Sequence, residues 1–146
     1  MTFVSGTGGS AAAPAAGRIR LVAAAAAVLT VGAGLGLRAV AAGNVAKYGG
    51  DALYTVLLVA LVVLVVPRWT PLRAAGTALA VSWAVELFQL SSLPAELSRQ
   101  SVAARLVLGS TFNAPDLFWY VVGAAGGWLF HTVMVAQRRP WAPTGR

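Results

Sequence analysis

The stretch AVSWAVELFQL, residues 80–90, places an acidic side chain inside an apolar segment that extends from about residue 74 to residue 93. A helix of this composition is typical of a membrane span, in which an ionised carboxylate near the middle costs about 2.5–3.5 kcal/mol. Glu86 and Gln89 are three positions apart and Ser82 lies one turn earlier, so the three side chains share one helix face. We therefore expect this face to contact protein or water rather than lipid.

The composition of the whole chain also indicates a membrane protein. Of 146 residues, 58% are hydrophobic and 10% are charged, whereas soluble domains have about 25% charged residues. The net charge of +7 would suggest nucleic acid in a soluble protein, but the basic residues lie singly or in pairs at the edges of apolar runs, where they contact lipid head groups. We expect membrane lipids as partners and no nucleic acid. The absence of cysteine and the single histidine predict neither a metal site nor a cofactor.

Four apolar runs predict an all-α fold, an integral membrane bundle of four transmembrane helices. The predicted spans cover about residues 20–38, 51–66, 74–93 and 116–136 of a transmembrane domain at residues 18–137. Residues 1–17 are expected to form a disordered cytoplasmic tail, and residues 138–146 a second cytoplasmic tail. Gly49 and Gly50 are expected to end any helix before Asp51, which would then cap the second span.

The first apolar run has a second interpretation. Arg18 and Arg20 followed by this run, with Ala39-Val40-Ala41 as a cleavage site, resemble a secretory signal peptide. The run is longer than the usual apolar core of about 7–15 residues, and Arg38 lies where a cleavage region is normally uncharged. These features favour a membrane span.

Two glycine pairs have the spacing that allows membrane helices to pack closely. They are Gly32 with Gly36 in the first span and Gly123 with Gly127 in the last. Either pair is a candidate contact for a second copy of the chain or for another membrane protein, which makes an assembly or scaffold role one alternative function.

The long connection at residues 91–113 has the pattern of one short helix lying in the membrane interface between the third and fourth spans. Pro94 can begin a helix, and apolar residues then recur at helical spacing opposite the polar positions Glu96, Arg99 and Gln100. Pro115 and Asp116 give the last span a helix start.

Charge bias predicts the orientation of the four spans. Seven basic residues lie on the side of the two termini and the second loop, and four lie on the other side, namely Arg38, Lys47, Arg99 and Arg105. The richer side is expected to be cytoplasmic, so both termini are predicted inside. The polar ends of the helices then converge in one outward-facing layer.

Several motifs resemble a bacterial membrane family called domain of unknown function 2809. The resemblance covers residues 34–127 and rests on Gly50-Asp51-Ala52-Leu53-Tyr54, Glu86-Leu87-Phe88-Gln89-Leu90 with Pro94, Leu106-Val107-Leu108-Gly109, Phe112, Asp116, Tyr120 and Gly123. Arg38 and Arg99 match as well, whereas Ala95 and Ala104 depart from the family pattern. A Glu and Gln in one span, an Arg in the following loop and an Asp opening the last span also resemble VanZ-like proteins, whose founder lowers sensitivity to a lipoglycopeptide antibiotic. Both resemblances imply a multi-pass protein of the bacterial cytoplasmic membrane.

The candidate binding residues are the polar groups of the outward-facing layer. They are Arg38, Asp51, Tyr54, Glu86, Gln89, Arg99, Asp116 and Tyr120. Arginines beside hydrogen-bonding acids suit a lipid head group, a polyprenyl phosphate or an amphiphilic antibiotic. An enzyme with Glu86 and Asp116 as general base and acid is an alternative. In a purely structural interpretation, Glu86 fixes helix register, Asp51 and Asp116 cap helices, and His131 is a core residue.

Overall fold

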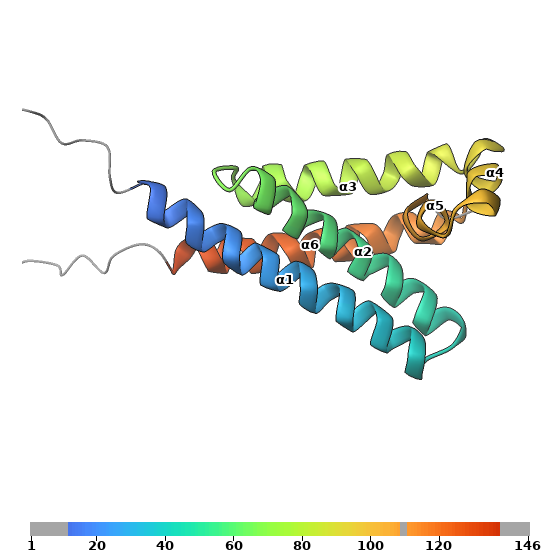
Figure 1. Ribbon diagram of the computed structural model, residues 1–146, viewed down its shortest axis with the longest axis horizontal. Helices are drawn as coiled ribbons and strands as arrows, with labels where there is room; N and C mark the ends of the chain where they lie inside the picture. Colours follow the sequence, from blue (N-terminus) through green and yellow to red (C-terminus); the bar gives the residue numbers. More distant parts are fainter. Residues whose placement is uncertain (1–11, 109–110, 138–146) are drawn as a thin grey trace, which may run out of the picture.

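The computed structural model describes residues 12–108 and 111–137, which form six helices and no strand (Figure 1). The helices are α1 (Ala12–Val40), α2 (Gly43–Val65), α3 (Pro71–Phe88), α4 (Leu93–Gln100), α5 (Val102–Leu108) and α6 (Ala114–Ala136). The prediction of an all-helical fold is therefore confirmed for the described residues.

Three of the described helices are long and apolar enough to cross a membrane. They are the part of α1 at Ala16–Val40, α2 and α6. The helices α3 and α4 meet at a bend of 92° and together make a fourth candidate span if the bent pair is counted as one. The structure thus contains three or four candidate spans.

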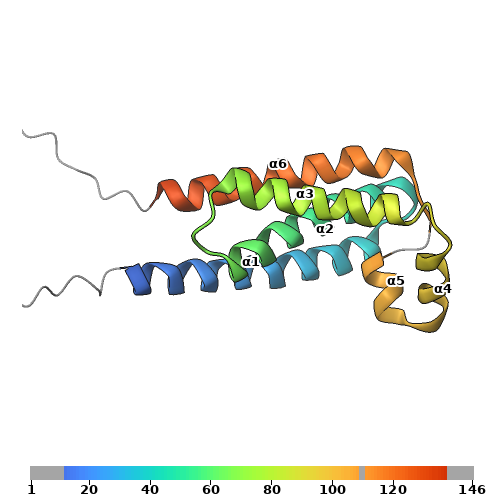
Figure 2. The same cartoon turned by 90° about the horizontal axis from the view of Figure 1, so that it is seen from above.

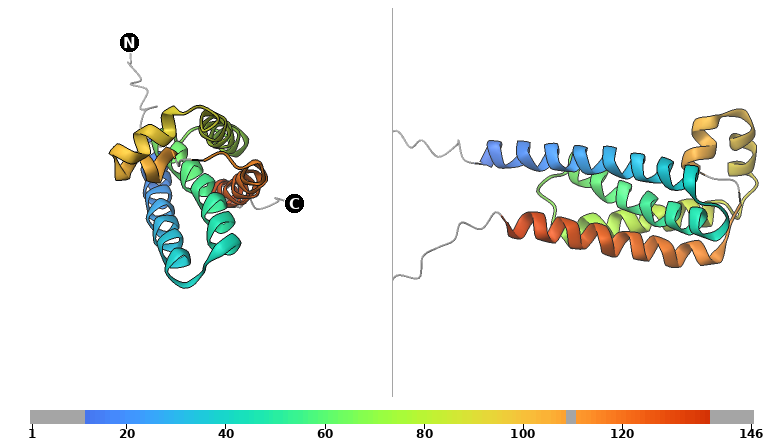
Figure 3. Two further views of the ribbon diagram at one scale, coloured as in Figure 1. Left: turned by 90° about the vertical axis from the view of Figure 1, so that its right-hand side faces the viewer. Right: turned by 90° about the horizontal axis from the view of Figure 1, so that it is seen from below.

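The helix α2 lies at the centre of the bundle. It contacts α1, α3 and α6, and α3 also contacts α6; seen along the long axis, α2 lies between α1 and α6 (Figure 3). The core consists mainly of small and β-branched residues, among them Ala74, Ala78, Val59 and Val63, and small residues let membrane helices approach closely. The short helices α4 and α5 lie at the opposite end from the start of α1 and the end of α6 (Figure 2).

The two glycine pairs have different surroundings. A Cβ atom on Gly123 would lie 2.2 Å from the carbonyl oxygen of Ala52, and one on Gly127 would lie 2.8 Å from a methyl group of Val59. This pair therefore lets α6 approach the backbone of α2. By contrast, Gly32 and Gly36 face open space and make no close helix contact within the described chain.

The helix α2 begins at Gly43, so the prediction that Gly49 and Gly50 end any helix before Asp51 is wrong. Asp51 lies in the third turn and is not a helix cap. A Cβ on Gly49 would lie 2.5 Å from the side chain of Leu37, so this glycine makes room for α1. That packing offsets the cost of a helical glycine, about 1 kcal/mol. Helix α1 also begins earlier than expected, because residues 12–17 of the predicted first tail are helical. The rest of that tail and the predicted second tail at residues 138–146 lie outside the described residues.

The connection between α3 and α6 also differs from the prediction. Helix α3 ends at Phe88 rather than near residue 93, and the hydroxyl of Ser91 donates to the carbonyl oxygen of Phe88 at 2.8 Å, which replaces a helical hydrogen bond. The single expected interfacial helix is two helices, α4 and α5, separated by Ser101 in an extended conformation. The hydroxyl of Ser101 accepts from the backbone N–H of Ala104 at 3.3 Å and caps α5.

Candidate functional site

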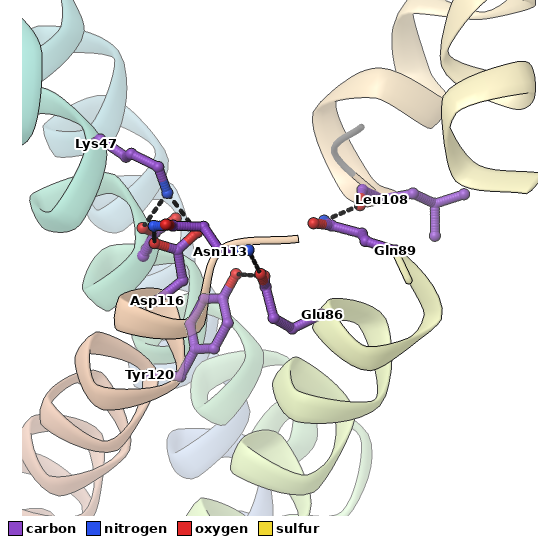
Figure 4. Close-up of polar contacts among 8 residues, drawn as sticks. Lys47, Glu86, Gln89, Leu108, Asn113, Asp116 and Tyr120 are labelled. Carbon is purple, nitrogen blue, oxygen red and sulfur yellow. Dashed lines mark hydrogen bonds and ion pairs between the residues drawn. The ribbon is translucent and has the colours of Figure 1, made fainter. Parts of the chain in front are cut away.

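Glu86 joins α3 to the beginning of α6 and is buried, with 1% of its surface exposed. Its carboxylate accepts a hydrogen bond from the backbone N–H of Asn113 at 2.5 Å and one from the hydroxyl of Tyr120 at 3.0 Å (Figure 4). Both donors are neutral groups. The acid in the middle of the apolar stretch therefore has protein partners on both of its oxygens.

A second cluster, which we call the lysine cluster, consists of Lys47, Asp51, Asp116 and the side chain of Asn113. The ammonium of Lys47 donates to Asp116 and lies 3.5 Å from Oδ2 of Asp51 (Figure 4). The amide of Asn113 donates to the other oxygen of Asp116. One cation thus forms ion pairs with two carboxylates, one on α2 and one on α6.

A hydrogen bond also connects α2 and α3 one turn before Glu86. The hydroxyls of Thr55 and Ser82 are 2.9 Å apart, and Ser82 donates to the carbonyl oxygen of Ala78 at 3.0 Å. Both hydroxyls are fully buried. The polar stripe predicted on α3 therefore continues from Glu86 to Ser82 and faces protein.

A cavity of about 490 Å³ lies among α1, α2, α3, α5 and α6 beside these two networks. Its polar lining is formed by Thr30, Arg38, Lys47, Asp51, Tyr54, Glu86, Gln89, Arg105, Thr111, Asp116 and Tyr120. Its apolar lining includes Val31, Leu35, Leu53 and Leu57 from α1 and α2. On α1 the lining positions are 30, 31, 34, 35 and 38, one face of a helix that ends at the polar part of the cavity.

Two cations of the cavity lining have no acidic partner among the residues that the structure describes. Arg38 comes from the last turn of α1 and Arg105 from α5. Within residues 12–108 and 111–137, no carboxylate lies within ion-pair distance of either guanidinium. The three acids of the cavity are instead held by Lys47, Asn113 and Tyr120.

Every residue of the predicted binding set except Arg99 lines the cavity. Arg99 is on α4, its side chain is 73% exposed, and it pairs with Glu96 at 2.5 Å. Because α5 turns back toward the bundle after α4, the arginine that reaches the cavity is Arg105. The charge pattern predicts Arg105 at this end of the bundle, but the predicted binding set does not include it.

Lys47 and Asn113 were also missing from the predicted set. Lys47 lies outside the predicted spans because Gly49 and Gly50 predict a break before Asp51, whereas the structure places it in the second turn of α2. Asn113 donates to Glu86 through its backbone N–H and to Asp116 through its side-chain amide. Its position two residues before Pro115 and three residues before Asp116 is the signal in the sequence for such a local contact.

We expect Tyr120→Phe to lower the free energy of unfolding by about 1–2 kcal/mol, because Oε2 of the buried Glu86 loses its donor. Thermal unfolding of the purified protein in detergent micelles, followed by circular dichroism, measures the change. Tyr48→Phe is the matched control, because the ring of Tyr48 stacks on Trp119 and its stacking does not need the hydroxyl. Equal stability of wild type and Tyr120→Phe would contradict the role given to this hydrogen bond.

Comparison with known proteins identifies the region that contains most of the site. Residues 40–124 match the model of a family described as protein of unknown function, DUF2809. The matched region begins just after Arg38 and includes Lys47, Asp51, Glu86, Arg105 and Asp116. No curated protein and no solved structure matches the chain significantly.

Proposed function

The chain belongs to the DUF2809 family, and we propose that it is a multi-pass membrane protein whose cavity binds the anionic head group of an amphiphile. A phospholipid, a polyprenyl phosphate or an amphiphilic antibiotic would each supply such a group. The proposal includes an envelope role similar to that of VanZ-like proteins, in the cytoplasmic membrane of a bacterium.

The observation that carries this proposal is the pair of guanidinium groups, Arg38 and Arg105, at a cavity whose acids pair with Lys47 or accept from Asn113 and Tyr120 instead. A guanidinium presents a rigid fork of N–H donors that fits phosphate and carboxylate oxygens. An arginine without an acidic partner beside a cavity is suited to bind an anion from outside the protein. The apolar lining next to it, from Val31 and Leu35 on α1 and Leu57 on α2, suits a hydrocarbon chain.

The proposed arrangement in the membrane has four spans, with α3 as the third and α4 and α5 in the outer interface. The 18 residues of α3 extend for about 27 Å, close to the hydrocarbon thickness of about 30 Å. The excess of basic residues at the end with the start of α1 and the end of α6 supports cytoplasmic termini. The cavity, at the other end, would then open toward the outer leaflet.

The contacts of the acids favour binding over acid–base catalysis. Glu86 accepts from Asn113 and Tyr120, and Asp116 accepts from Lys47 and the amide of Asn113. A general base has to accept a proton from its substrate, whereas these lone pairs point at protein donors. We therefore assign both acids to the framework that holds α2, α3 and α6 around the cavity.

We expect Arg38→Ala and Arg105→Ala each to weaken binding of an anionic short-chain lipid by about tenfold or more, as each removes charged hydrogen bonds to phosphate. Isothermal titration of dihexanoyl phosphatidylglycerol into the purified protein measures the affinity. Arg99→Ala is the matched control, since Arg99 pairs with Glu96 outside the cavity. Identical affinities for all three variants and wild type would refute the proposal.

A further inference from the structure

Two acceptor atoms of residues that line the cavity have no hydrogen-bond donor in the described part of the chain. They are Oε1 of Gln89 and Oδ2 of Asp51, and both atoms are buried. Buried acceptors in proteins nearly always have a partner. Because both residues line the cavity, a molecule bound there can supply the missing donors.

The orientation of the Gln89 amide is fixed by its neighbour. Its nitrogen donates to the carbonyl oxygen of Leu108, the last residue of α5 (Figure 4). Because a carbonyl oxygen can only accept, the amide nitrogen must face Leu108, and the amide oxygen is left on the other side. Gln89 thus holds α5 near α3 and keeps one acceptor available.

Asp51 is in a comparable position on α2. Its Oδ2 lies 3.5 Å from the ammonium of Lys47, which is an ion-pair distance, but the contact does not have the geometry of a hydrogen bond. Asp51 therefore keeps a negatively charged acceptor with no donor of its own. Such an oxygen prefers an O–H or N–H donor, and most strongly an ammonium.

We infer that the amphiphile carries hydrogen-bond donors, hydroxyl or ammonium groups, next to its phosphate. This inference rests on the proposed function, because the phosphate is assigned to Arg38 and Arg105. The donors then reach Gln89, which follows α3, and Asp51 on α2. A phosphate ester that lacks donors leaves both buried oxygens unsatisfied, and desolvated unpaired acceptors disfavour binding.

The test compares two matched lipid pairs with the full-length protein in detergent micelles. Dihexanoyl phosphatidylglycerol has hydroxyl donors and phosphatidylethanol of the same chain length has none, at equal charge. Phosphatidylethanolamine has an ammonium with N–H donors, and phosphatidylcholine has a cation without them. We expect the donor-bearing member of each pair to bind about tenfold more tightly in isothermal titration.

Single substitutions show which side chains cause the preference for donor-bearing lipids. Gln89→Leu and Asp51→Ala are each expected to bring the affinity ratios closer to one, whereas Arg38→Ala should weaken the binding of all four lipids and leave the ratios unchanged. Gln100→Leu is the control, because Gln100 is exposed on α4 and donates to Glu96. The wild-type ratios test the inference even if a variant does not fold.

The outcomes separate the inference from the proposed function. Equal affinity within both lipid pairs would overturn the donor requirement while phosphate binding stood. If replacing Arg38 or Arg105 left the affinity for all four lipids unchanged, the proposed function itself would be overturned. If soluble glycerophosphoglycerol competed as strongly as the short-chain lipid, the natural ligand would be a free phosphate ester with the same head-group chemistry. Weak competition supports a membrane lipid.

Discussion

Replacing Gly123 by alanine is expected to lower the free energy of unfolding by about 3 kcal/mol, at the upper end of the cost of overpacking. The added Cβ would lie 2.2 Å from the carbonyl oxygen of Ala52 and 3.0 Å from Cβ of Thr55. The first of these atoms belongs to the α2 backbone and cannot rotate away as a side chain does. The two helices would have to separate, and the Lys47 to Asp116 contact between them would lengthen. Thermal unfolding in detergent micelles measures the loss of stability.

The matched control is Gly126→Ala, three residues further along α6. A Cβ at this position meets nothing within 4 Å, and alanine favours a helix over glycine by up to about 1 kcal/mol. We expect this variant to be as stable as wild type or slightly more stable. If both substitutions shifted the unfolding temperature downward by the same amount, the close contact between α2 and α6 would be contradicted.

The polar faces of the long helices could be predicted from the sequence, because helical periodicity alone decides which residues share a face. Ser82 and Glu86 on α3 are both buried, as the cost of placing polar groups in lipid requires. Asp116 and Tyr120 on α6 lie on one buried face with Gly123 and Gly127. The apolar runs likewise predicted the helical membrane-type fold.

The residues that complete the site could not be predicted, because their positions depend on where helices end. Gly49 and Gly50 disfavour a helix locally, but the packing of Leu37 against α2 overrides this preference and places Lys47 on a helix beside Asp51. The choice between Arg99 and Arg105 depended on one break at Ser101, which a continuous helical pattern did not reveal. Packing between helices decides the first case, whereas the break at Ser101 is local, because its hydroxyl caps α5.

Replacing Lys47 by methionine is expected to lower the free energy of unfolding by about 2–3 kcal/mol. Among the described residues, Lys47 is the one cation within ion-pair distance of Asp51 and Asp116. Removal of one partner of a fully buried ion pair costs about 3–5 kcal/mol, because the other charge stays desolvated. The side chain of Asp116 is 5% exposed and that of Lys47 is 43% exposed, so water near the lysine reduces the effect. Chemical unfolding in mixed micelles measures it.

Comparison with an exposed ion pair separates the cost of a desolvated carboxylate from the loss of the charge–charge attraction. Arg99→Met also removes a contact with a carboxylate, but Glu96 is 54% exposed and water solvates it at once, so the expected loss is below about 1 kcal/mol. Asp116→Asn should cost less in the Lys47→Met background than in wild type, because the charge that it removes there has already lost its partner. Additive losses from Lys47→Met and Asp116→Asn would mean that the two side chains act independently. The lysine cluster would then not be what holds the start of α2 against the start of α6, and the shape of the cavity between them would need another cause.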